Sequence, residues 1–310
     1  MDEPEPPDFD PPECPQCDRT IADGGDRCRE CEATGNKPDG RPRSATESPL
    51  RTVGVAVGLA VLGLILLVAV GLASAVGLFL VVWLATGDLP SEFSVLVVST
   101  AVGQYVGFLG LGLAYLRYRG FDRARITDYL GVRWPTLREV GLIVVGYVAI
   151  IVVVIVWAGL IDTLVATEPA DNEGAETIAA AENPWVLPAA IALMFLVVGP
   201  CEEVLYRGVV QNRLRERLSA VPSIFIASAV FAAVHVVAFA AEPMAVLVAI
   251  GILLGPSVVF GAIYEYTQNI VVPSLLHGLH NSIIVVLILA GPDPDGNGAV
   301  IAPLTSILPV

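Results

Sequence analysis

The sequence has few charges, and most of those it has are negative. Charged residues make up 15% of its 310 positions, and Lys37 is the only lysine. Asp and Glu total 31 against 17 for Lys and Arg, which gives a net charge of −14 at pH 7. A nucleic-acid partner requires a basic face, so this balance argues against one.

Charge is absent altogether from several long stretches of the chain. Hydrophobic residues make up 55% of the sequence and the mean hydropathy is +0.72, which is well above the apolar share of soluble proteins. Stretches of about 20 apolar residues are long enough to cross a hydrocarbon core of about 30 Å as a helix. They lack the period-2 alternation of transmembrane strands. The predicted fold class is therefore all-α, a polytopic transmembrane helical bundle that lies in the lipid bilayer.

Seven apolar runs are candidate spans, at residues 53–86, 94–116, 140–161, 185–201, 222–241, 244–264 and 270–290. Arginines cluster before the first run, after the second and after the fourth, and cytoplasmic loops are the ones that collect arginine. This rule makes 53–86 one tilted helix. It predicts about seven spans in the cell membrane, with the N-terminus cytoplasmic and the C-terminus outside. GxxxG pairs at Gly54/Gly58, Gly103/Gly107 and Gly251/Gly255 indicate no more than ordinary helix packing.

The first fifty residues are polar and have no basic start followed by an apolar core, so no cleavable signal peptide is expected. Two CxxC pairs, ten residues apart, contain four of the five cysteines: Cys14, Cys17, Cys28 and Cys31. Four thiolates in this pattern can hold one Zn²⁺, and a segment with so little aliphatic content needs a metal to fold. The alternative is two disulfides, which require an oxidising compartment.

Residues 10–36 resemble a zinc ribbon of the small kind fused to many prokaryotic membrane proteins. Four cysteine ligands leave the metal no open position, so the zinc is predicted to be structural and the ribbon to bind a protein partner or stabilise the chain. The predicted organisation is a zinc-ribbon-like segment at 10–36, a linker at 37–51, N-terminal membrane helices at 52–184, a catalytic membrane core at 185–290 and a C-terminal tail at 291–310.

Ionisable residues at membrane depth are confined to the C-terminal half of the chain. Run 140–161 has none, whereas the later runs, with the residues that directly follow the run 185–201, contain two glutamates, one arginine and every histidine of the protein: Glu202, Glu203, Arg207, His235, His277 and His280. Such residues cost about 2.5–3.5 kcal/mol on insertion scales and usually mark a functional site. The asymmetry predicts a site in the last four runs.

Glu202 and Glu203 point about 100° apart on a helix, so they are expected to have different tasks. Glu203 and Arg207 are four residues apart with the acid first, which is the favourable order for an ion pair. Glu202 is left without a local partner and suits general-base work on water. The alternative is a capping or snorkelling cluster at the cytoplasmic end of a helix.

Two further pairs lie four residues apart, Phe231 with His235 and His277 with Asn281. A single buried histidine is more often a structural residue than a catalyst. His277 and Asn281, however, share one helical face, and their N–H groups can point at one oxygen, as an oxyanion hole requires. Pro200 and Pro273 precede the key stretches. They are expected to break the helices there and help to open a wet cavity.

The motifs follow one another in the order EExxxR, FxxxH and HxxxN, each on its own apolar segment. This order resembles the CPBP family (CAAX protease and bacteriocin processing), which includes the type II CAAX prenyl endopeptidases, over roughly residues 185–290. The resemblance implies an intramembrane endopeptidase in which Glu202 and His235 activate water, His277 and Asn281 stabilise the oxyanion, and Glu203 supports the site with Arg207. The implied substrate is a protein or peptide at the membrane, prenylated or CAAX-like.

Whether the active site holds a metal stays open at this stage. Two histidines and a glutamate can ligate zinc and leave a fourth position free, but the sequence has no HExxH motif, and a glutamate–histidine pair can polarise water by itself. Two other functions compete with the protease. A non-catalytic scaffold or bacteriocin-immunity-like protein has no need of all these residues. A proton-coupled transporter predicts an internal repeat and charged groups in both halves, which the sequence lacks.

Overall fold

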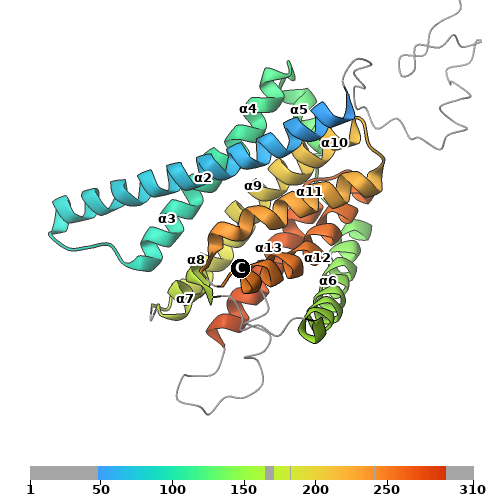
Figure 1. The fold of residues 1–310 in the computed structure, drawn as a ribbon. Coiled ribbons are helices and arrows are strands. Elements are labelled where there is room, and N and C mark those ends of the chain that lie inside the picture. The colour runs from blue at the N-terminus through green and yellow to red at the C-terminus, as the bar shows by residue number, and fades with distance from the viewer. Residues whose placement is uncertain (1–47, 165–170, 182, 241, 291–310) are drawn as a thin grey trace, which may run out of the picture. The chain divides into compact units, whose positions relative to one another are not determined.

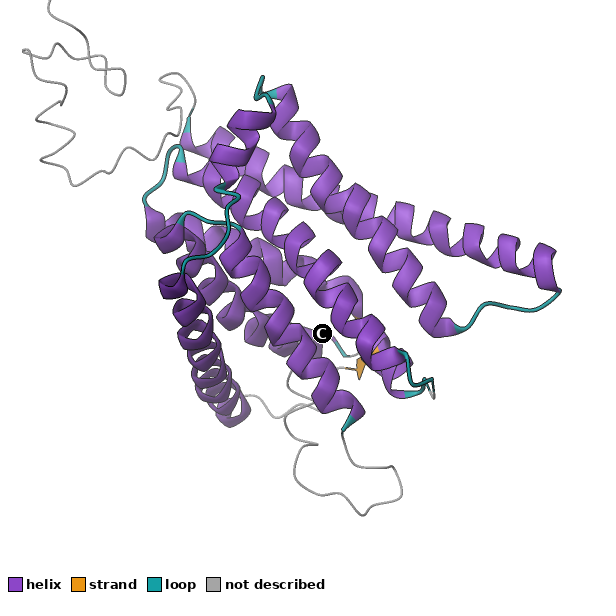
Figure 2. Cartoon of the chain, turned by 180° about the vertical axis from the view of Figure 1, so that it is seen from behind, coloured by secondary structure: helices purple, strands orange, loops and turns teal. Residues whose placement is uncertain are grey.

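The computed structural model describes residues 48–164, 171–181, 183–240 and 242–290. All of them belong to one unit of the chain, residues 44–310. The predicted zinc-ribbon-like segment, most of the linker and the C-terminal tail lie outside the described residues. Most of these residues are helical. Figure 2 shows loops and turns between the helices and one pair of very short strands. The predicted all-α fold is confirmed.

The first half of the described chain consists of α2 (Pro49–Thr86), α3 (Glu92–Gln104), the π-helix η1 (Tyr105–Gly110), α4 (Leu111–Tyr118), α5 (Arg123–Leu130), α6 (Leu137–Leu164), β1 (Asp171–Asn172) and α7 (Glu173–Ala179). The second half consists of α8 (Val186–Leu193), the π-helix η2 (Met194–Val198), α9 (Gly199–Glu203), the π-helix η3 (Val204–Gln211), α10 (Asn212–Arg215), α11 (Ala220–Val234), the 3₁₀-helix η4 (His235–Ala238), β2 (Phe239–Ala240), α12 (Pro243–Thr267) and α13 (Val271–Leu289). Strands β1 and β2 pair antiparallel.

Seven helices in the described part of the chain are long and apolar enough to cross a membrane, which confirms the predicted number. They run over Pro49–Thr86, Glu92–Tyr118, Leu137–Leu160, Val186–Arg215, Ala220–Ala238, Pro243–Thr267 and Val271–Leu289. The fourth helix extends 14 residues beyond the apolar run 185–201 that predicted it. Its polar C-terminal half is buried by neighbouring helices, which is why hydropathy alone ended it too early.

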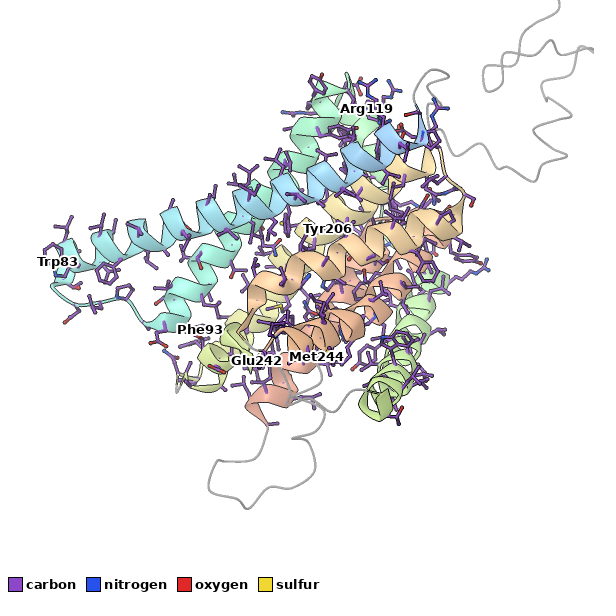
Figure 3. The ribbon with its side chains drawn as sticks, viewed as in Figure 1. Trp83, Phe93, Arg119, Tyr206, Glu242 and Met244 are labelled. Carbon is purple, nitrogen blue, oxygen red and sulfur yellow. The ribbon has the colours of Figure 1, made fainter. Side chains whose placement is uncertain are left out.

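The first span is a single helix, as predicted. Helix α2 begins at Pro49, four residues before the predicted run 53–86, because Ser48 caps it by accepting a hydrogen bond from the backbone N–H of Arg51. Its 38 residues correspond to about 57 Å at 1.5 Å per residue, which exceeds the thickness of a hydrocarbon core. Figure 3 shows Trp83 at the far end of this helix.

Close approach of two backbones joins α2 to α3, which lie side by side in Figure 1. A Cβ added to Gly103 would lie 2.8 Å from the carbonyl oxygen of Leu67, and one added to Gly107 would lie 2.5 Å from the backbone nitrogen of the same residue. Small residues at these two positions therefore set the distance between the helices. Gly54 and Gly58 have nothing within 4 Å, so that pair makes no such contact among the described residues.

The fourth and seventh spans form the centre of the bundle. Helix 186–215 and α13 have the largest buried share of the seven candidate spans, and α13 packs against α8, η2 and α9. The peripheral α2 and α6 expose apolar side chains along most of their length, as lipid-facing helices do. Five of the six predicted catalytic residues, all but His235, thus lie on the two spans that are best shielded from lipid.

Pro200 does not break its helix, contrary to the sequence-based expectation. Helix 186–215 is continuous, and the missing N–H of the proline is accommodated by a change of helical winding. The π-helical turns of η2 end where the N–H of Gly199 bonds to the carbonyl of Met194, five residues earlier. Pro273 lies in the first turn of α13, where a proline is tolerated. Neither proline interrupts a span.

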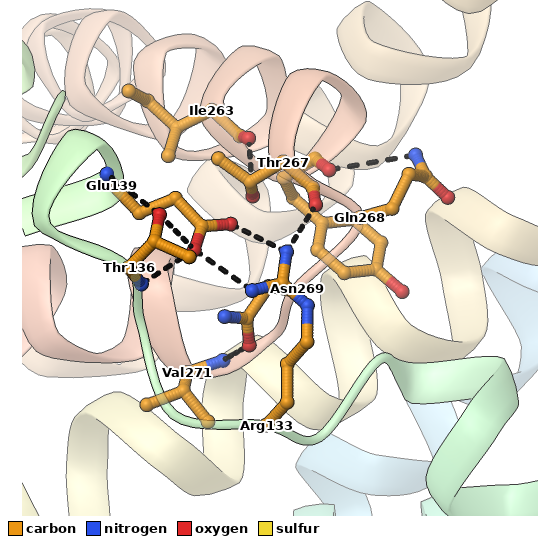
Figure 4. A network of polar contacts seen from close by, with 9 residues as sticks. Arg133, Thr136, Glu139, Ile263, Thr267, Gln268, Asn269 and Val271 are labelled. Carbon is orange, nitrogen blue, oxygen red and sulfur yellow. Dashed lines mark hydrogen bonds and ion pairs between the residues drawn. The ribbon is translucent and has the colours of Figure 1, made fainter.

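A polar junction fixes the start of α13. Arg133 donates two hydrogen bonds to the carboxylate of Glu139, at 2.8 and 2.6 Å, and a third to the carbonyl oxygen of Thr267 at 3.3 Å (Figure 4). Hydrogen bonding to Glu139 raises the pKa of Arg133 above its ordinary value. The N–H of Ile270 also donates to the carbonyl of Leu130. The segment between α5 and α6 thereby holds the turn that precedes α13.

Gly131→Ala is expected to destabilise the protein, because this junction leaves no room for a side chain. Gly131 has a φ of +67°, and a Cβ there would lie 1.9 Å from the carbonyl oxygen of Gln268. The left-handed backbone alone costs a non-glycine residue about 1–2 kcal/mol, and the clash adds to it. Thermal melting in detergent measures the loss. Gly120→Ala is the matched control, because Gly120 has a φ of +81° and nothing within 4 Å. Equal melting temperatures for the two variants would contradict the expected clash.

Candidate active site

Glu202 and Glu203 lie in the middle of the fourth span. They end the short α9, between the π-helical segments η2 and η3, and 12 residues separate Glu203 from the end of the helix at Arg215. Both carboxylates are buried, Glu203 completely. A snorkelling or capping cluster requires a position at the helix end and an exposed head group. These two glutamates have neither feature, so the alternative reading does not apply to them.

His277 brings α13 to both glutamates. Its Nδ1 lies 3.0 Å from Oε1 of Glu203, within hydrogen-bonding distance, and its Nε2 lies 3.8 Å from Oε2 of Glu202. The two carboxylates do point in different directions, as adjacent helix residues must. They nevertheless lie next to the two ring nitrogens of the same imidazole. The sequence around the glutamates does not predict this arrangement. A hydrogen bond from one ring nitrogen also fixes the tautomer and orientation of a histidine.

Glu203 and Arg207 form the ion pair that their spacing predicts. Oε2 of Glu203 lies 3.3 Å from Nε of Arg207, and both side chains are fully buried. The guanidinium also donates to the carbonyl and to the hydroxyl of Ser257 on α12, at 3.0 and 2.9 Å. Its face lies over the ring of Phe231, 4.7 Å from the ring centroid. Arg207 is therefore held by three helices, and its charge is compensated inside the bundle.

The Arg207–Ser257 contact is the first of three polar contacts that join the fourth span to α12. Gln211 donates to the carbonyl of Gly261 at 3.1 Å, and Arg215 pairs with Glu265 at 2.9 Å. The donors recur every four residues and so do their partners, so the two helices stay in register over about two turns. This register fixes the helix that carries the glutamates.

Two glycines let the glutamate helix approach the histidine helix closely. A Cβ on Gly199 would lie 2.7 Å from the carbonyl oxygen of Ser274, and one on Gly278 would lie 2.8 Å from Cδ1 of Phe195. Gly278 follows His277 directly in the sequence. The small residues therefore permit the spacing at which a carboxylate on α9 can reach an imidazole on α13.

His235 lies at the edge of this cluster. It begins η4 at the end of α11, it is partly exposed, and its Nδ1 lies 2.8 Å from the carbonyl oxygen of Phe231. The ring of Phe231 lies next to both histidines. The centroid of the Phe231 ring is 4.7 Å from that of His235 and 5.8 Å from that of His277. The ring of Tyr206 also packs on Phe231, in the interior of the bundle (Figure 3). The predicted FxxxH pair thus adjoins the glutamates through its phenylalanine.

Asn281 is buried on α13, one turn after His277. Among the described residues its side chain makes no hydrogen bond. His280 is also buried on this helix, but it faces Tyr147 of α6 and the edge of Phe260. The two histidines of α13 therefore have different surroundings. His277 contacts the glutamates, and His280 packs among aromatic rings.

Three residues of the site have no place in the predicted motifs. Gln104 at the end of α3 donates a hydrogen bond to Oε1 of Glu202 at 2.6 Å. Ser257 holds Arg207, and Phe260 stacks on His277 with a centroid distance of 4.7 Å and an angle of 18°. A usable signal existed for Gln104, since it is the one amide side chain in the apolar run 94–116.

The described residues offer no group of three or more His, Cys, Asp or Glu side chains arranged to hold a metal ion. Glu202, His235 and His277 therefore form no such group among the described residues. The predicted zinc ligands at the N-terminus, Cys14, Cys17, Cys28 and Cys31, lie outside the described residues.

The arrangement concentrates buried polar atoms that lack a hydrogen-bond partner in the described structure. They include Oε2 of Glu202, the hydroxyl of Tyr206 and Nη1 of Arg207. Burying such groups without partners is costly, and native proteins keep few of them. A carboxylate oxygen with free lone pairs beside an imidazole and an amide side chain is suited to proton transfer from water.

A comparison with protein families finds one match, in the half of the chain that contains this site. Residues 184–283 match the family described as Type II CAAX prenyl endopeptidase Rce1-like. The matched segment runs from the start of the fourth span to α13 and includes all three motifs. Searches of curated proteins and of solved structures find no match for the chain.

Proposed function

Because residues 184–283 belong to the type II CAAX prenyl endopeptidase Rce1-like family, we propose that this multi-pass membrane protein is a glutamate-dependent intramembrane endopeptidase. Its substrates are membrane-associated proteins, prenylated or CAAX-like. The observation that carries the proposal is the buried convergence of Glu202 and Glu203 on the two nitrogens of His277. Charged groups at this depth are retained for function rather than for stability.

In the proposed mechanism Glu202 is the general base. Its Oε2 takes a proton from water, and the oxygen of that water forms a bond to the carbonyl carbon of the scissile peptide. The tetrahedral intermediate then collapses, the C–N bond breaks, and the proton on Glu202 passes to the departing amine. His235, which begins η4 directly after α11, assists in binding the attacking water.

His277 and Asn281 stabilise the oxyanion in this proposal. They lie one turn apart on α13. With Nδ1 of His277 donating to Glu203, Nε2 can donate to the oxyanion only when the ring is protonated on both nitrogens, and this is the form that the mechanism requires. Donors that are already in place when charge develops are worth about 10²–10³ in turnover each. Arg207 compensates the charge of Glu203, and Ser257 and Phe231 hold Arg207.

The non-catalytic alternatives receive less support from this geometry. A scaffold or bacteriocin-immunity-like protein gains nothing from two buried glutamates on one histidine, because such charges destabilise a fold unless they are well compensated. A proton-coupled transporter requires a relay that continues across the membrane. The described ion pairs beyond this cluster lie toward the end of the fourth span at Arg215 and in the junction around Arg133.

The direct test is cleavage of a peptide library by the purified protein. The library includes farnesylated and unmodified C-terminal peptides, and mass spectrometry identifies the products. Wild-type protein is expected to cut at defined bonds, and Glu202→Ala is expected to cut none of them. Equal cleavage by the two proteins would assign the activity to a contaminant and overturn the proposal.

The N-terminal segment is proposed to be a structural zinc ribbon in the cytoplasm, which offers a surface to a protein partner. Its four thiolates require the reducing compartment in which the arginine distribution places this end. Full-length protein is expected to contain one zinc per chain, and simultaneous Cys→Ser changes at Cys14, Cys17, Cys28 and Cys31 to remove it. Cys201→Ser, which changes the one buried cysteine of the described part, is the control and should retain the metal. Two disulfides and no zinc by mass spectrometry would contradict this prediction.

A further inference from the structure

The hydrogen bond between Gln104 and Glu202 joins two parts of the chain that lie 98 residues apart. Gln104 is buried, and its Nε2 donates to Oε1 of Glu202 at 2.6 Å. The glutamine belongs to the second span, outside the segment 184–283 that matches the family. Among the described residues, this is the hydrogen bond that holds the Glu202 carboxylate, since its other oxygen has no such partner.

The position of Gln104 is fixed by two glycines of the second span, Gly103 on α3 and Gly107 on η1. Gly103 and Gly107 pack on the backbone of α2 at Leu67 and leave little freedom for the helix to rotate. Tyr105, the first residue of η1, donates a separate hydrogen bond from its hydroxyl to the carbonyl of Leu196 on the fourth span at 3.1 Å, and this contact does not involve Glu202. The π-helical segment η1 also begins directly after Gln104, and such segments often occur at functional sites.

The physical effect of this contact is to orient one carboxylate. A glutamate has three rotatable bonds, and the carboxyl group of Glu202 receives a donor only on Oε1. With Oε1 held by the amide, Oε2 is directed toward Nε2 of His277, 3.8 Å away. We propose that Gln104 is a positioning residue for the general base, and that the N-terminal membrane helices therefore complete the active site instead of serving only as an anchor. This inference rests on the proposed protease function.

The first test is Gln104→Leu, which keeps a similar volume but removes the amide donor. A hydrogen bond to a charged group supports an expected fall in kcat of about 10- to 100-fold. KM should stay within about twofold, because Gln104 contacts the base and not the substrate. Tyr105→Phe is the matched control. It removes the neighbouring hydrogen bond between the same two spans without touching Glu202, and its kcat should be close to wild type. Equal kcat for Gln104→Leu and Tyr105→Phe would overturn the inference.

A second variant covers the case in which Gln104→Leu does not fold. Gln104→Asn retains the polar amide but is one methylene shorter, so it cannot hold Oε1 at 2.6 Å and should also lose kcat. In the Glu202→Gln background, either change at position 104 should cause no further loss, because a residue that acts through Glu202 has nothing left to position. Additive losses would show that Gln104 acts elsewhere and would overturn the inference.

Infrared spectroscopy separates this inference from the proposed function. With ¹³C-labelled glutamate, the band that disappears in Glu202→Gln is assigned to the Glu202 carboxylate, and Gln104→Leu should shift that band while Tyr105→Phe leaves it unchanged. An unshifted band in Gln104→Leu refutes the contact whether or not the protein is a protease. A shifted band with no peptide cleavage by wild type would leave the contact established and overturn the role in catalysis together with the proposed function.

Discussion

Glu202→Gln is expected to lower the rate of peptide cleavage by at least about 10²-fold while the bundle stays folded. The substitution preserves the size of the side chain, and its amide oxygen can still accept the hydrogen bond from Gln104. It removes the one property that the mechanism requires, since an amide cannot take a proton from water. Turnover per folded molecule, with folding checked by thermal melting, measures the effect. Glu92→Gln, an exposed change on α3, should leave turnover unchanged.

The same experiment also tests whether the active site requires a metal ion. It is performed on a variant that lacks residues 1–43, so that the zinc predicted at Cys14, Cys17, Cys28 and Cys31 does not interfere. Near-normal turnover by Glu202→Gln would remove Glu202 from the role of base and assign the water to Glu203 or to a metal. Activity that is lost with a chelator and restored by zinc would make the protein a metalloprotease and replace the mechanism proposed above.

Glu203→Gln is expected to fail in a different way, through stability. Both Glu203 and Arg207 are fully buried, and the substitution leaves the guanidinium without its carboxylate. Removing one partner of a buried ion pair costs about 3–5 kcal/mol, because the other charge stays in a low-dielectric interior. The hydrogen bond to Nδ1 of His277 changes at the same time. A large drop in melting temperature and poor expression are therefore expected.

The matched control for this change is Glu265→Gln. Glu265 also pairs with an arginine of the fourth span, Arg215, but both side chains of that pair are partly exposed. Partly exposed pairs contribute about 1 kcal/mol or less. The melting temperature of Glu265→Gln should thus stay near that of wild type. Equal melting temperatures for Glu203→Gln and Glu265→Gln would show that the buried pair is not the stabilising element inferred here.

The sequence by itself determined the number of spans, the helical fold and the pair formed by Glu203 and Arg207. These features depend on the length of apolar runs or on neighbours within one helical turn, and both are local properties of the chain. The predicted end of the fourth span and the predicted break at Pro200 were wrong for the same reason. Neighbouring helices bury polar residues such as Gln211, so the fourth span continues past its apolar run. A π-helical turn accommodates Pro200 without a break. Neither effect depends on the local sequence alone.

Only the tertiary structure decided what surrounds Glu202. Gln104 reaches it across 98 residues, His277 reaches Glu203 across 74, and Ser257 reaches Arg207 across 50. Such contacts depend on how close two helices approach and in which register. Those quantities are set here by glycines at helix crossings, such as Gly199, and by polar contacts repeated every four residues along α12. Helical periodicity predicts which residues share a face, but the partner of that face follows from packing the whole bundle.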